Sequence, residues 1–430
     1  MTISNAEQYL LELMNRARLD PAGEAARFGI DLNDGLARGT ISAAAKQVLA
    51  PNLSLEAAAT GHSLWMLDQD VFSHTGAGGS NPSARMAAQG YRAMPWGENL
   101  AIKGSSAAIT VEASIEEMNQ LLFKSAVHRN DLMVSGIREV GIGAETGVYN
   151  QAGTNFNAVM LTEDFGTTGT SRFVTGVCYS DSDANKFYSM GEGKAGVSFT
   201  VGAVTGVSAA AGGYAVAAGT SASTLVSGSS GALTFQVNLD LSRGNVKLDL
   251  VDDAKFLTSG NITLISGINN AELLGVDNLN ATGNAAANLL TGNSRANQLF
   301  GMDGNDVLTG LGGNDLLSGG NGRDVLLGGS GNDTLSGGAG NDRMSGGAGA
   351  DTFVFASRFG VDVITDFRIA DQDRLSFSHN LWTGTKTAAE VVAQFAHVGV
   401  NEVVFDFGVD EVHLTGLTSL IGLDSTLLIV

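Results

Sequence analysis

A nine-residue period in the C-terminal third of the chain is the feature that most constrains its fold. Aspartate recurs at this period, and an apolar residue follows two positions after each aspartate. The aspartates are Asp306, Asp315, Asp324, Asp333, Asp342 and Asp351, and the apolar residues are Leu308, Leu317, Leu326, Leu335, Met344 and Phe353. A short fixed period indicates a solenoid whose units stack on one another. Asn288 and Asn297 keep the same register, so we expect the repeat to begin in degraded form near residue 280.

The residues around each aspartate favour calcium. In the copy Gly328–Ser336, glycines precede Asp333, and the whole chain has 58 Gly against 4 Pro. Glycines allow sharp turns that expose backbone carbonyls, and carbonyl and carboxylate oxygens are the ligands that Ca²⁺ prefers. The six aspartates are therefore predicted calcium ligands, and the apolar positions a predicted core. A metal-free Gly-rich solenoid or a low-complexity linker is the alternative, but neither accounts for the strict register of the aspartates.

This segment resembles the RTX repeats of bacterial exoproteins over residues of about 300–353. The resemblance implies a parallel β-roll that is unfolded in the calcium-poor cytosol and folds after export. The formal net charge of −20 fits this behaviour, because carboxylates on adjacent turns repel one another until a cation bridges them, and binding energy is then also folding energy.

The two ends of the chain suggest a route of export. Residues 351–355, 363–367 and 373–376 resemble the cap that follows RTX repeats in secreted metalloproteases and related exoproteins. The last residues, Leu423–Val430, place an acidic residue before an apolar terminus, as uncleaved type I secretion signals do; the alternative is simply a last β-strand. Residues 1–7 lack the basic and apolar pattern of a signal peptide. We therefore expect an extracellular protein of a Gram-negative bacterium, with type I secretion machinery as a partner.

Charge and cysteine content exclude several other classes. The acidic surface argues against a nucleic-acid partner, because phosphate binding needs a basic surface. No apolar run approaches the roughly 20 residues of a membrane span. The single Cys178 cannot form an intramolecular disulfide, so calcium rather than disulfides is expected to stabilise the folded chain.

Phrases spread over residues 1–166 resemble the CAP superfamily of cysteine-rich secretory, antigen 5 and pathogenesis-related proteins in its bacterial form. They are Leu13–Arg18 with Asp20-Pro21, Phe72–Gly76, Gly90-Tyr91, Gly97–Ala101, Ser125–Leu132 and Gly141–Gly143. The resemblance implies an α/β/α sandwich with an open cleft, in which His74, Glu98 and His128 converge. Ser125 stands where animal and plant relatives place a second Glu.

The predicted cleft leaves two classes of function open. Two imidazoles and a carboxylate could hold Zn²⁺ or act as an acid/base pair, which would make the domain a metal-assisted extracellular hydrolase. The domain could instead be a non-enzymatic module that binds lipid, matrix or a host surface, which the loss of the second Glu slightly favours. A third interpretation is that His74, Glu98 and His128 form a structural polar network. The target, whether ligand or substrate, is unknown.

A second calcium site is predicted between these regions. Asp181, Asp183, Asn185, Phe187 (through its carbonyl) and Glu192 occupy positions 1, 3, 5, 7 and 12 of a loop with EF-hand-like spacing. Lys186 stands where the sharp turn normally needs Gly, and a solvated acidic hairpin is the alternative. Residues 191–197 resemble calcium-binding, transthyretin-like B-type repeats of bacterial surface proteins, which implies a β-sandwich.

The predicted architecture is thus multidomain. An α/β/α CAP sandwich is expected over residues 1–166 and a small β-sandwich spacer over 167–255. A parallel β-roll over 256–353, degenerate before about 300, and a β-rich cap with the export signal over 354–430 complete the chain.

Overall fold

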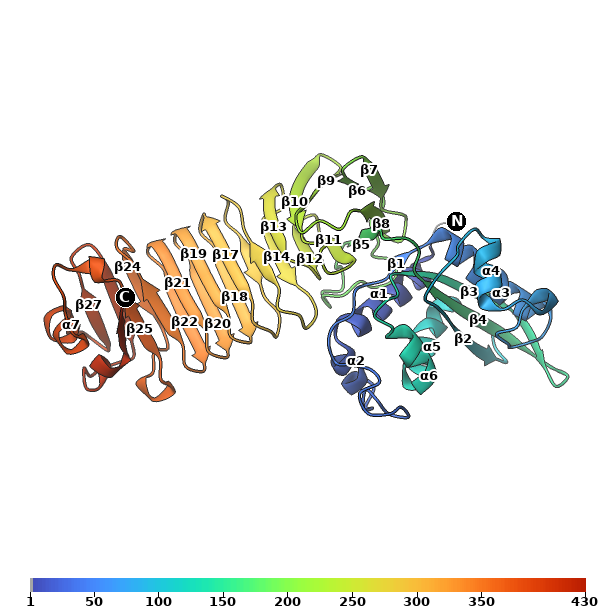
Figure 1. Ribbon diagram of the computed structural model, residues 1–430, viewed down its shortest axis with the longest axis horizontal. Helices are drawn as coiled ribbons and strands as arrows, with labels where there is room; N and C mark the ends of the chain where they lie inside the picture. Colours follow the sequence, from blue (N-terminus) through green and yellow to red (C-terminus); the bar gives the residue numbers. More distant parts are fainter. Residues whose placement is uncertain (1–2) are drawn as a thin grey trace. The chain divides into compact units, whose positions relative to one another are not determined.

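The computed structural model describes residues 3–430 (Figure 1). The chain forms two compact units: the first runs to Thr234 and includes Leu239–Asp253, and the second comprises Phe235–Asn238 and Ala254–Val430. Each unit is described by itself. None of the helices in the described residues is long and apolar enough to cross a membrane.

The N-terminal part of the first unit is an α/β/α sandwich around a four-stranded sheet of order β1-β3-β4-β2. The strands are β1 (Ala50–Pro51), β2 (Trp96–Ser105), β3 (Glu139–Gln151) and β4 (Thr154–Gly166), and only β1 is parallel to its neighbour. The helices are α1 (Asn5–Leu19), α2 (Pro21–Arg27), α3 (Leu53–Asp68), α4 (Pro82–Ala88), α5 (Val111–Lys124) and α6 (Ala126–Leu132). This confirms the predicted fold class for the domain.

The two faces of the sheet bury alternate residues of β4, as the period of two in a strand requires. Val159 and Leu161 pack with apolar residues of α1, α5 and α6, while Ala158 and Met160 pack against α3. Figure 1 shows α3 and α4 on one side of the sheet and α1, α5 and α6 on the other. The hydrophobic effect of burying both faces therefore fixes the three layers.

Several phrases that resembled the CAP superfamily have structural roles. Before these phrases, Ser4 and Glu7 form a capping box at the start of α1, with 3.2 Å from the Glu7 amide to Ser4 Oγ and 2.9 Å from the Ser4 amide to Glu7 Oε2. Gly141 and Gly143 let α3 approach β3, because a Cβ on Gly141 would lie 2.0 Å from the Leu55 carbonyl carbon.

Two buried arginines within these phrases bind loops rather than a ligand. Arg18 donates to the backbone carbonyls of Gln47, Leu132, Val134 and Ile137. Arg129 in the same way donates to the carbonyls of Leu32, Phe123, Lys124 and Asp34. Since buried carbonyls need a donor, each guanidinium supplies hydrogen bonds to four backbone carbonyls.

The remaining strands of the first unit belong to two further sheets. One contains β5 (Arg172–Tyr179), β8 (Gly213–Ala218) and β11 (Val246–Val251), and the other contains β6 (Ser198–Val201), β7 (Val204–Val207) and β9 (Thr224–Ser230). Phe199 of β6 stacks on Tyr214 of β8, with 3.8 Å between ring centroids. The two sheets thus face each other across an aromatic core.

A buried ion cluster joins this region to α1. The Lys247 ammonium on β11 contacts Glu12 Oε2 at 2.7 Å and the carboxylate of Asp249, and all three side chains are almost completely buried. Burial raises the pKa of Glu12 to about 7 and also raises that of Asp249, while Lys247 opposes both shifts. The lysine charge is therefore what keeps two buried carboxylates compatible with the fold.

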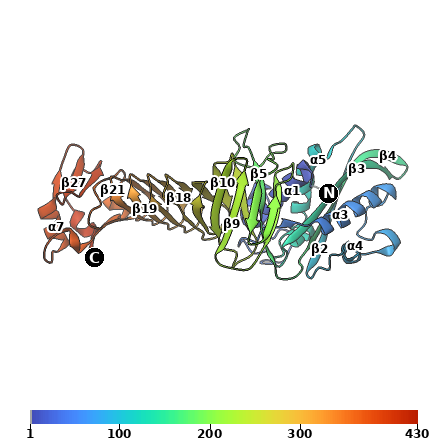
Figure 2. The same ribbon diagram turned by 90° about the horizontal axis from the view of Figure 1, so that it is seen from above.

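The second unit is a parallel solenoid with two ladders of strands. One ladder contains β12 (Lys255–Thr258), β14 (Asn270–Leu273), β16 (Leu289–Thr291), β18 (Val307–Gly312), β20 (Val325–Ser330), β22 (Arg343–Ala348) and β24 (Val361–Ile364). The other contains β13 (Ile262–Ser266), β15 (Asn280–Thr282), β17 (Gln298–Asp303), β19 (Leu316–Gly322), β21 (Thr334–Gly340), β23 (Thr352–Phe355) and β25 (Arg374–Phe377). Figure 2 shows these turns following one another along the solenoid.

Register within the ladders confirms the predicted roll. Leu299 pairs with Leu317, and Leu317 with Leu335, so that one turn takes two nine-residue units. The apolar residue of every unit from Leu290 to Phe353 has no exposed surface. Burial of such side chains contributes roughly 1.5–3 kcal/mol each, and it holds adjacent turns in line.

The chain after the repeats is β-rich, as expected. It contains β26 (Ala396–Val398), β27 (Glu402–Asp406), β28 (Glu411–Thr415) and β29 (Leu427–Ile429), with a short helix, α7 (Ala388–Phe395). β28 continues the ladder of β24, and β29 continues that of β25, both in parallel register. The terminal residues that resembled a secretion signal therefore include a strand in the folded chain.

Candidate calcium sites and the histidine cleft

The repeat aspartates form two ladders of side chains inside the roll. One oxygen of each carboxylate accepts a hydrogen bond from the backbone amide of the corresponding residue one turn earlier, which is Asn288 or Asn297 for the first two aspartates and an aspartate for the other four. The distance from the Asp306 amide to Asp324 Oδ1 is 2.8 Å, and it is 2.9 Å from the Asp333 amide to Asp351 Oδ1. All six predicted ligands are buried and repeat this contact with neighbouring turns.

The second carboxylate oxygen gives the test of whether these residues fit calcium. Oδ2 is buried without a hydrogen-bond partner in Asp306, Asp315, Asp324, Asp333 and Asp342. A buried carboxylate oxygen without a donor is costly unless a cation neutralises it. These orphaned oxygens therefore fit a bound divalent cation.

Backbone carbonyls meet the same oxygens. A Cβ added to Gly301 would lie 2.2 Å from Asp306 Oδ2 and 2.5 Å from the carbonyl oxygen of Gly319, one turn later. Gly310 is in the same position between Asp315 and Gly328. Glycine thus keeps open a space lined by oxygens of two adjacent turns, as a calcium site requires. Each ion in the ladder would bridge two turns.

Burial and mutual repulsion disfavour the charged form of the roll aspartates when no cation is bound. Burial raises the pKa of Asp306, Asp315, Asp333, Asp342 and Asp351 to about 6, against a backbone hydrogen bond that lowers each of them. Like-charged aspartates of adjacent turns add to several of these shifts. Calcium bound against the carboxylates would remove this penalty, so metal affinity and folding are coupled in the roll.

The upstream asparagines close their turns without a cation. The side-chain nitrogen Nδ2 of Asn288 donates to the Asn269 carbonyl at 2.9 Å and to Asn284 Oδ1 at 3.1 Å. In the same way, Nδ2 of Asn297 donates to the Leu279 carbonyl and to Asn293 Oδ1. Each of these turns therefore carries a pair of asparagines four residues apart, a signal that the nine-residue period alone does not reveal.

Two turns of the roll carry backbone strain. Glycines at the second turn position, such as Gly320 and Gly338, have positive φ values of 114° and 106°. Met302 and Leu311 occupy that position with φ of 85° and 77°, which is costly for a large side chain. Such strain costs about 1–3 kcal/mol per residue, so calcium and stacking must offset it in these turns.

The N-terminal domain brings His74 and Glu98 into direct contact. His74, in the loop after α3, has its Nδ1 2.7 Å from Glu98 Oε1 on β2. Arg85 of α4 contacts the other oxygen of Glu98 and also donates to the His74 carbonyl at 3.0 Å. Glu98 is buried, whereas 56% of the His74 side chain is exposed. The buried carboxylate thus orients, through Nδ1, an imidazole that is more than half exposed.

His128 lies near His74 but does not contact Glu98 directly. It lies on α6, and its carbonyl accepts a hydrogen bond of 3.3 Å from Asn99 on β2. Burial lowers the pKa of His128, and the nearby His74 lowers it further. The two histidines are therefore close enough for their charges to interact. Among the described residues, three potential metal ligands gather tightly in the acidic loop of residues 181–192, described below, and not at these histidines.

The sequence prediction missed two acids in this cleft. Asp131 lies one turn after His128 on α6; burial raises its pKa, and His74 opposes that shift. Asp164 is buried on β4 directly opposite Glu98 in the antiparallel register. Burial and the adjacent Glu98 raise its pKa well above the ordinary value. Asp131 stood within the phrase Ser125–Leu132 and could have been considered, whereas only the strand register reveals Asp164.

The acidic loop of residues 181–192 gathers three of its five predicted ligands. Asp181, Asp183 and Glu192 have carboxylate oxygens that all lie within 4.8 Å of one another. Glu192 accepts hydrogen bonds from Ser182, Asp183 and Ser189, and Asn185 Oδ1 accepts one from the Phe187 amide. Lys186 adopts a positive φ of 64°, which is the turn that Gly normally supplies. Calcium binding by this loop stays a prediction.

Comparison with known families supports both resemblances. Residues 11–162 match the cysteine-rich secretory protein family, known as CAP. Residues 282–317 and 318–353 match the RTX calcium-binding nonapeptide repeat. The chain therefore carries a CAP domain followed by RTX calcium-binding repeats, and calcium is the ligand of that repeat class. No curated protein matches the chain.

Solved structures give partial likenesses. An extracellular SCP-domain protein of Bacillus anthracis is 22% identical over 29% of this chain and 35% of its own, with a TM-score of 0.22. An extracellular lipase of Serratia marcescens is 17% identical over 40% and 42%, with a TM-score of 0.19. A subunit of the mannuronan C5-epimerase of Azotobacter vinelandii is 28% identical over 34% and 78%, with a TM-score of 0.21. The chain thus spans about a third of the first of these proteins.

Proposed function

We propose that the protein is an extracellular calcium-binding protein whose CAP domain recognises an external target through the cleft of His74, Glu98 and His128. The single observation that carries the proposal is the contact of His74 with the buried Glu98, which orients an imidazole that is more than half exposed. Secretion is inferred from the roll, because extracellular calcium modules bind with dissociation constants of about 10⁻⁴–10⁻³ M, and a solenoid that depends on such weak binding folds only where calcium is plentiful. Recovery of the chain from the culture medium checks this placement.

Binding is the function that the cleft supports best. Glu98 has both oxygens engaged, by His74 and Arg85, so its charge is largely balanced within the domain. The exposed surface of the cleft is then an imidazole beside a second, partly buried imidazole. Such a pair can accept or donate hydrogen bonds to a polar target group, and it does not need a metal to do so.

A hydrolytic role is the second candidate, and the two missed acids favour it. His74 oriented by a carboxylate is the arrangement of a general base, and burial raises the pKa of Asp164 well above its ordinary value, which is the direction that a general acid needs. Zinc held by His74 and His128 would supply a Lewis acid and activate a water molecule. In either form His74 is the residue that the reaction depends on.

The double substitution His74→Ala, His128→Ala should abolish target binding and any hydrolysis by the full chain. Removal of two partly exposed side chains should change the free energy of unfolding by no more than about 1–2 kcal/mol. Panels of esters, peptides and sterol-containing vesicles, with Zn²⁺ alone as a further ligand, would be tested by calorimetry and by product release. His397→Ala, an exposed histidine outside the cleft, is the matched control.

Each outcome of this experiment discriminates between the assignments. Loss of binding without hydrolysis in the parent chain supports a binding module, and stoichiometric Zn²⁺ that the double variant loses supports a metal-assisted enzyme. A double variant that retains activity but unfolds far more easily would contradict the proposal and make the two histidines structural.

A further inference from the structure

One buried carboxylate, which follows the matched repeats in the sequence, has the same environment as the aspartates of the roll. Asp362, at the start of β24, has no exposed surface, and its Oδ2 is buried without a hydrogen-bond partner. Its other oxygen accepts a hydrogen bond of 2.9 Å from the amide of Asp342. In the repeats, the same oxygen of Asp324 and of Asp342 accepts from the aspartate one turn earlier. The nine-residue period ends at Asp351, so the period does not predict this position.

The backbone around Asp362 also has the hydrogen bonds of a repeat turn. The Val361 amide donates to Oδ1 of Asn341, one turn before it, at 3.0 Å. The Arg323 amide donates in the same way to Oδ1 of Asn305, one turn before Arg323. The Val363 amide donates to the Asp342 carbonyl at 2.8 Å, which matches the bond from Arg343 to Asp324. The spacing between corresponding residues is 20 instead of 18, because two residues are inserted after Phe353. Asp362 thus occupies the aspartate position of a further turn.

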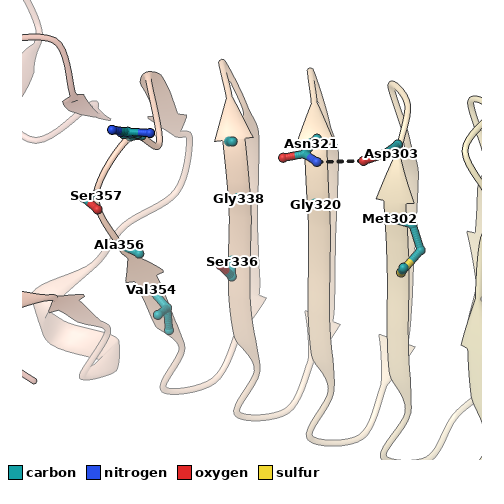
Figure 3. A pocket seen from close by; sticks show the side chains of 11 residues that line it. Met302, Asp303, Gly320, Asn321, Ser336, Gly338, Val354, Ala356 and Ser357 are labelled. Carbon is teal, nitrogen blue, oxygen red and sulfur yellow. Dashed lines mark hydrogen bonds between the residues drawn. The ribbon is translucent and has the colours of Figure 1, made fainter.

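The segment with the insertion, through Val354 and Ala356–Arg358, lines a groove that crosses successive turns of the roll. Figure 3 shows Met302, Gly320 and Gly338 at corresponding heights on neighbouring strands, with Ala356 and Ser357 continuing the series. The dashed line joins Asn321 Nδ2 to Asp303 Oδ1, which are 2.7 Å apart. The insertion therefore lies where the chain still follows the stacking of the repeats.

Other aspartates near the end of the roll differ from Asp362 in their contacts. Asp410 accepts from the amides of Arg358 and Gly360, and Asp373 accepts from those of Asp351 and Arg368, so that both oxygens of each are satisfied. Asp362 alone among these three keeps a buried oxygen without a donor. Asp342, on the adjacent turn, has an orphaned Oδ2 as well.

We propose that Asp342 and Asp362 hold a further Ca²⁺ between the last repeat turn and the turn of residues 359–362. The ion would be bound by carboxylate oxygens of two neighbouring turns, in the manner proposed for the upstream sites. It would join the C-terminal β-rich region to the repeats, since β24 is paired directly with β28. This inference rests on calcium binding by the roll, and the experiment separates the two.

Asp362→Asn in the full chain should lower the number of bound Ca²⁺ ions by one at saturation. Equilibrium dialysis with radioactive calcium measures this number. Asp371→Asn makes the same change of charge at a residue whose side chain is 39% exposed and should leave the number unchanged. Asp333→Asn is the positive control, because it removes a ligand of the matched repeats.

The controls distinguish failure of this site from failure of calcium binding by the roll. If Asp333→Asn lowers the number and Asp362→Asn does not, the proposed site is wrong while the roll is retained. If neither substitution has an effect, calcium binding by the roll itself is contradicted. Should Asp362→Asn fail to fold, anomalous diffraction from crystals of the unaltered chain with Tb³⁺ decides. A peak between Asp342 and Asp362 supports the site, and its absence overturns it.

Discussion

Replacing Asp333 and Asp342 together by Asn should raise the calcium concentration at the folding midpoint by about tenfold or more, which corresponds to roughly 1.4 kcal/mol or more. Each substitution removes a carboxylate whose Oδ2 is orphaned inside the roll. In the upstream turns, the side-chain amide of each asparagine at the aspartate position donates to a second Asn four residues earlier, as Asn288 does to Asn284. Gly329 and Gly338 hold that position before Asp333 and Asp342, so the new amides would lack this partner.

A calcium titration of the full chain followed by circular dichroism measures the midpoint. The double substitution Asp303→Asn, Asp406→Asn is the matched control, because both residues are exposed in the same unit and the charge change is identical. An equal shift in the control would mean that overall charge, rather than the buried ladder, sets the calcium requirement.

Lys247→Met should destabilise the first unit by about 3–5 kcal/mol, because it leaves Glu12 and Asp249 buried without their shared cation. Methionine nearly matches lysine in length, so lost charge rather than lost volume causes the effect. Lys194→Met is the matched control: Lys194 pairs with Asp253 where both side chains are about one-third exposed, and such a pair contributes less than about 1 kcal/mol.

Urea unfolding detected by tryptophan fluorescence measures this difference. Trp382→Phe in all variants confines the signal to Trp65 and Trp96, which belong to the first unit. Comparable losses for the Lys194 and Lys247 variants would show that the cluster is no more important than a surface ion pair.

The sequence predicted the fold where local patterns are strong. The nine-residue period is enough to predict the roll, its inward leucines and the six aspartates, because each unit contacts only its neighbours. The α/β/α domain followed from the phrases that resemble the CAP superfamily, and His74 with Glu98 followed from the same phrases. These residues lie in short motifs whose spacing can be recognised without knowledge of the tertiary structure.

Residues brought together by long-range pairing were not predictable in this way. Asp164 meets Glu98 only through the register of β2 and β4, and Lys247 meets Glu12 across more than two hundred positions of sequence. Asp362 was hidden by the two-residue insertion that interrupts the period. In each case the sequence carries the chemical group, but the pairing of strands decides which groups become neighbours.

Amide hydrogen exchange of the full chain with and without calcium tests the central claim most directly. We expect amides of residues 301–364 to be protected in calcium and to lose protection when the ion is chelated, because the buried carboxylates then repel one another. Amides of β2, β3 and β4 should remain protected under both conditions and serve as the internal reference. Equal protection of residues 301–364 with and without calcium would contradict the account.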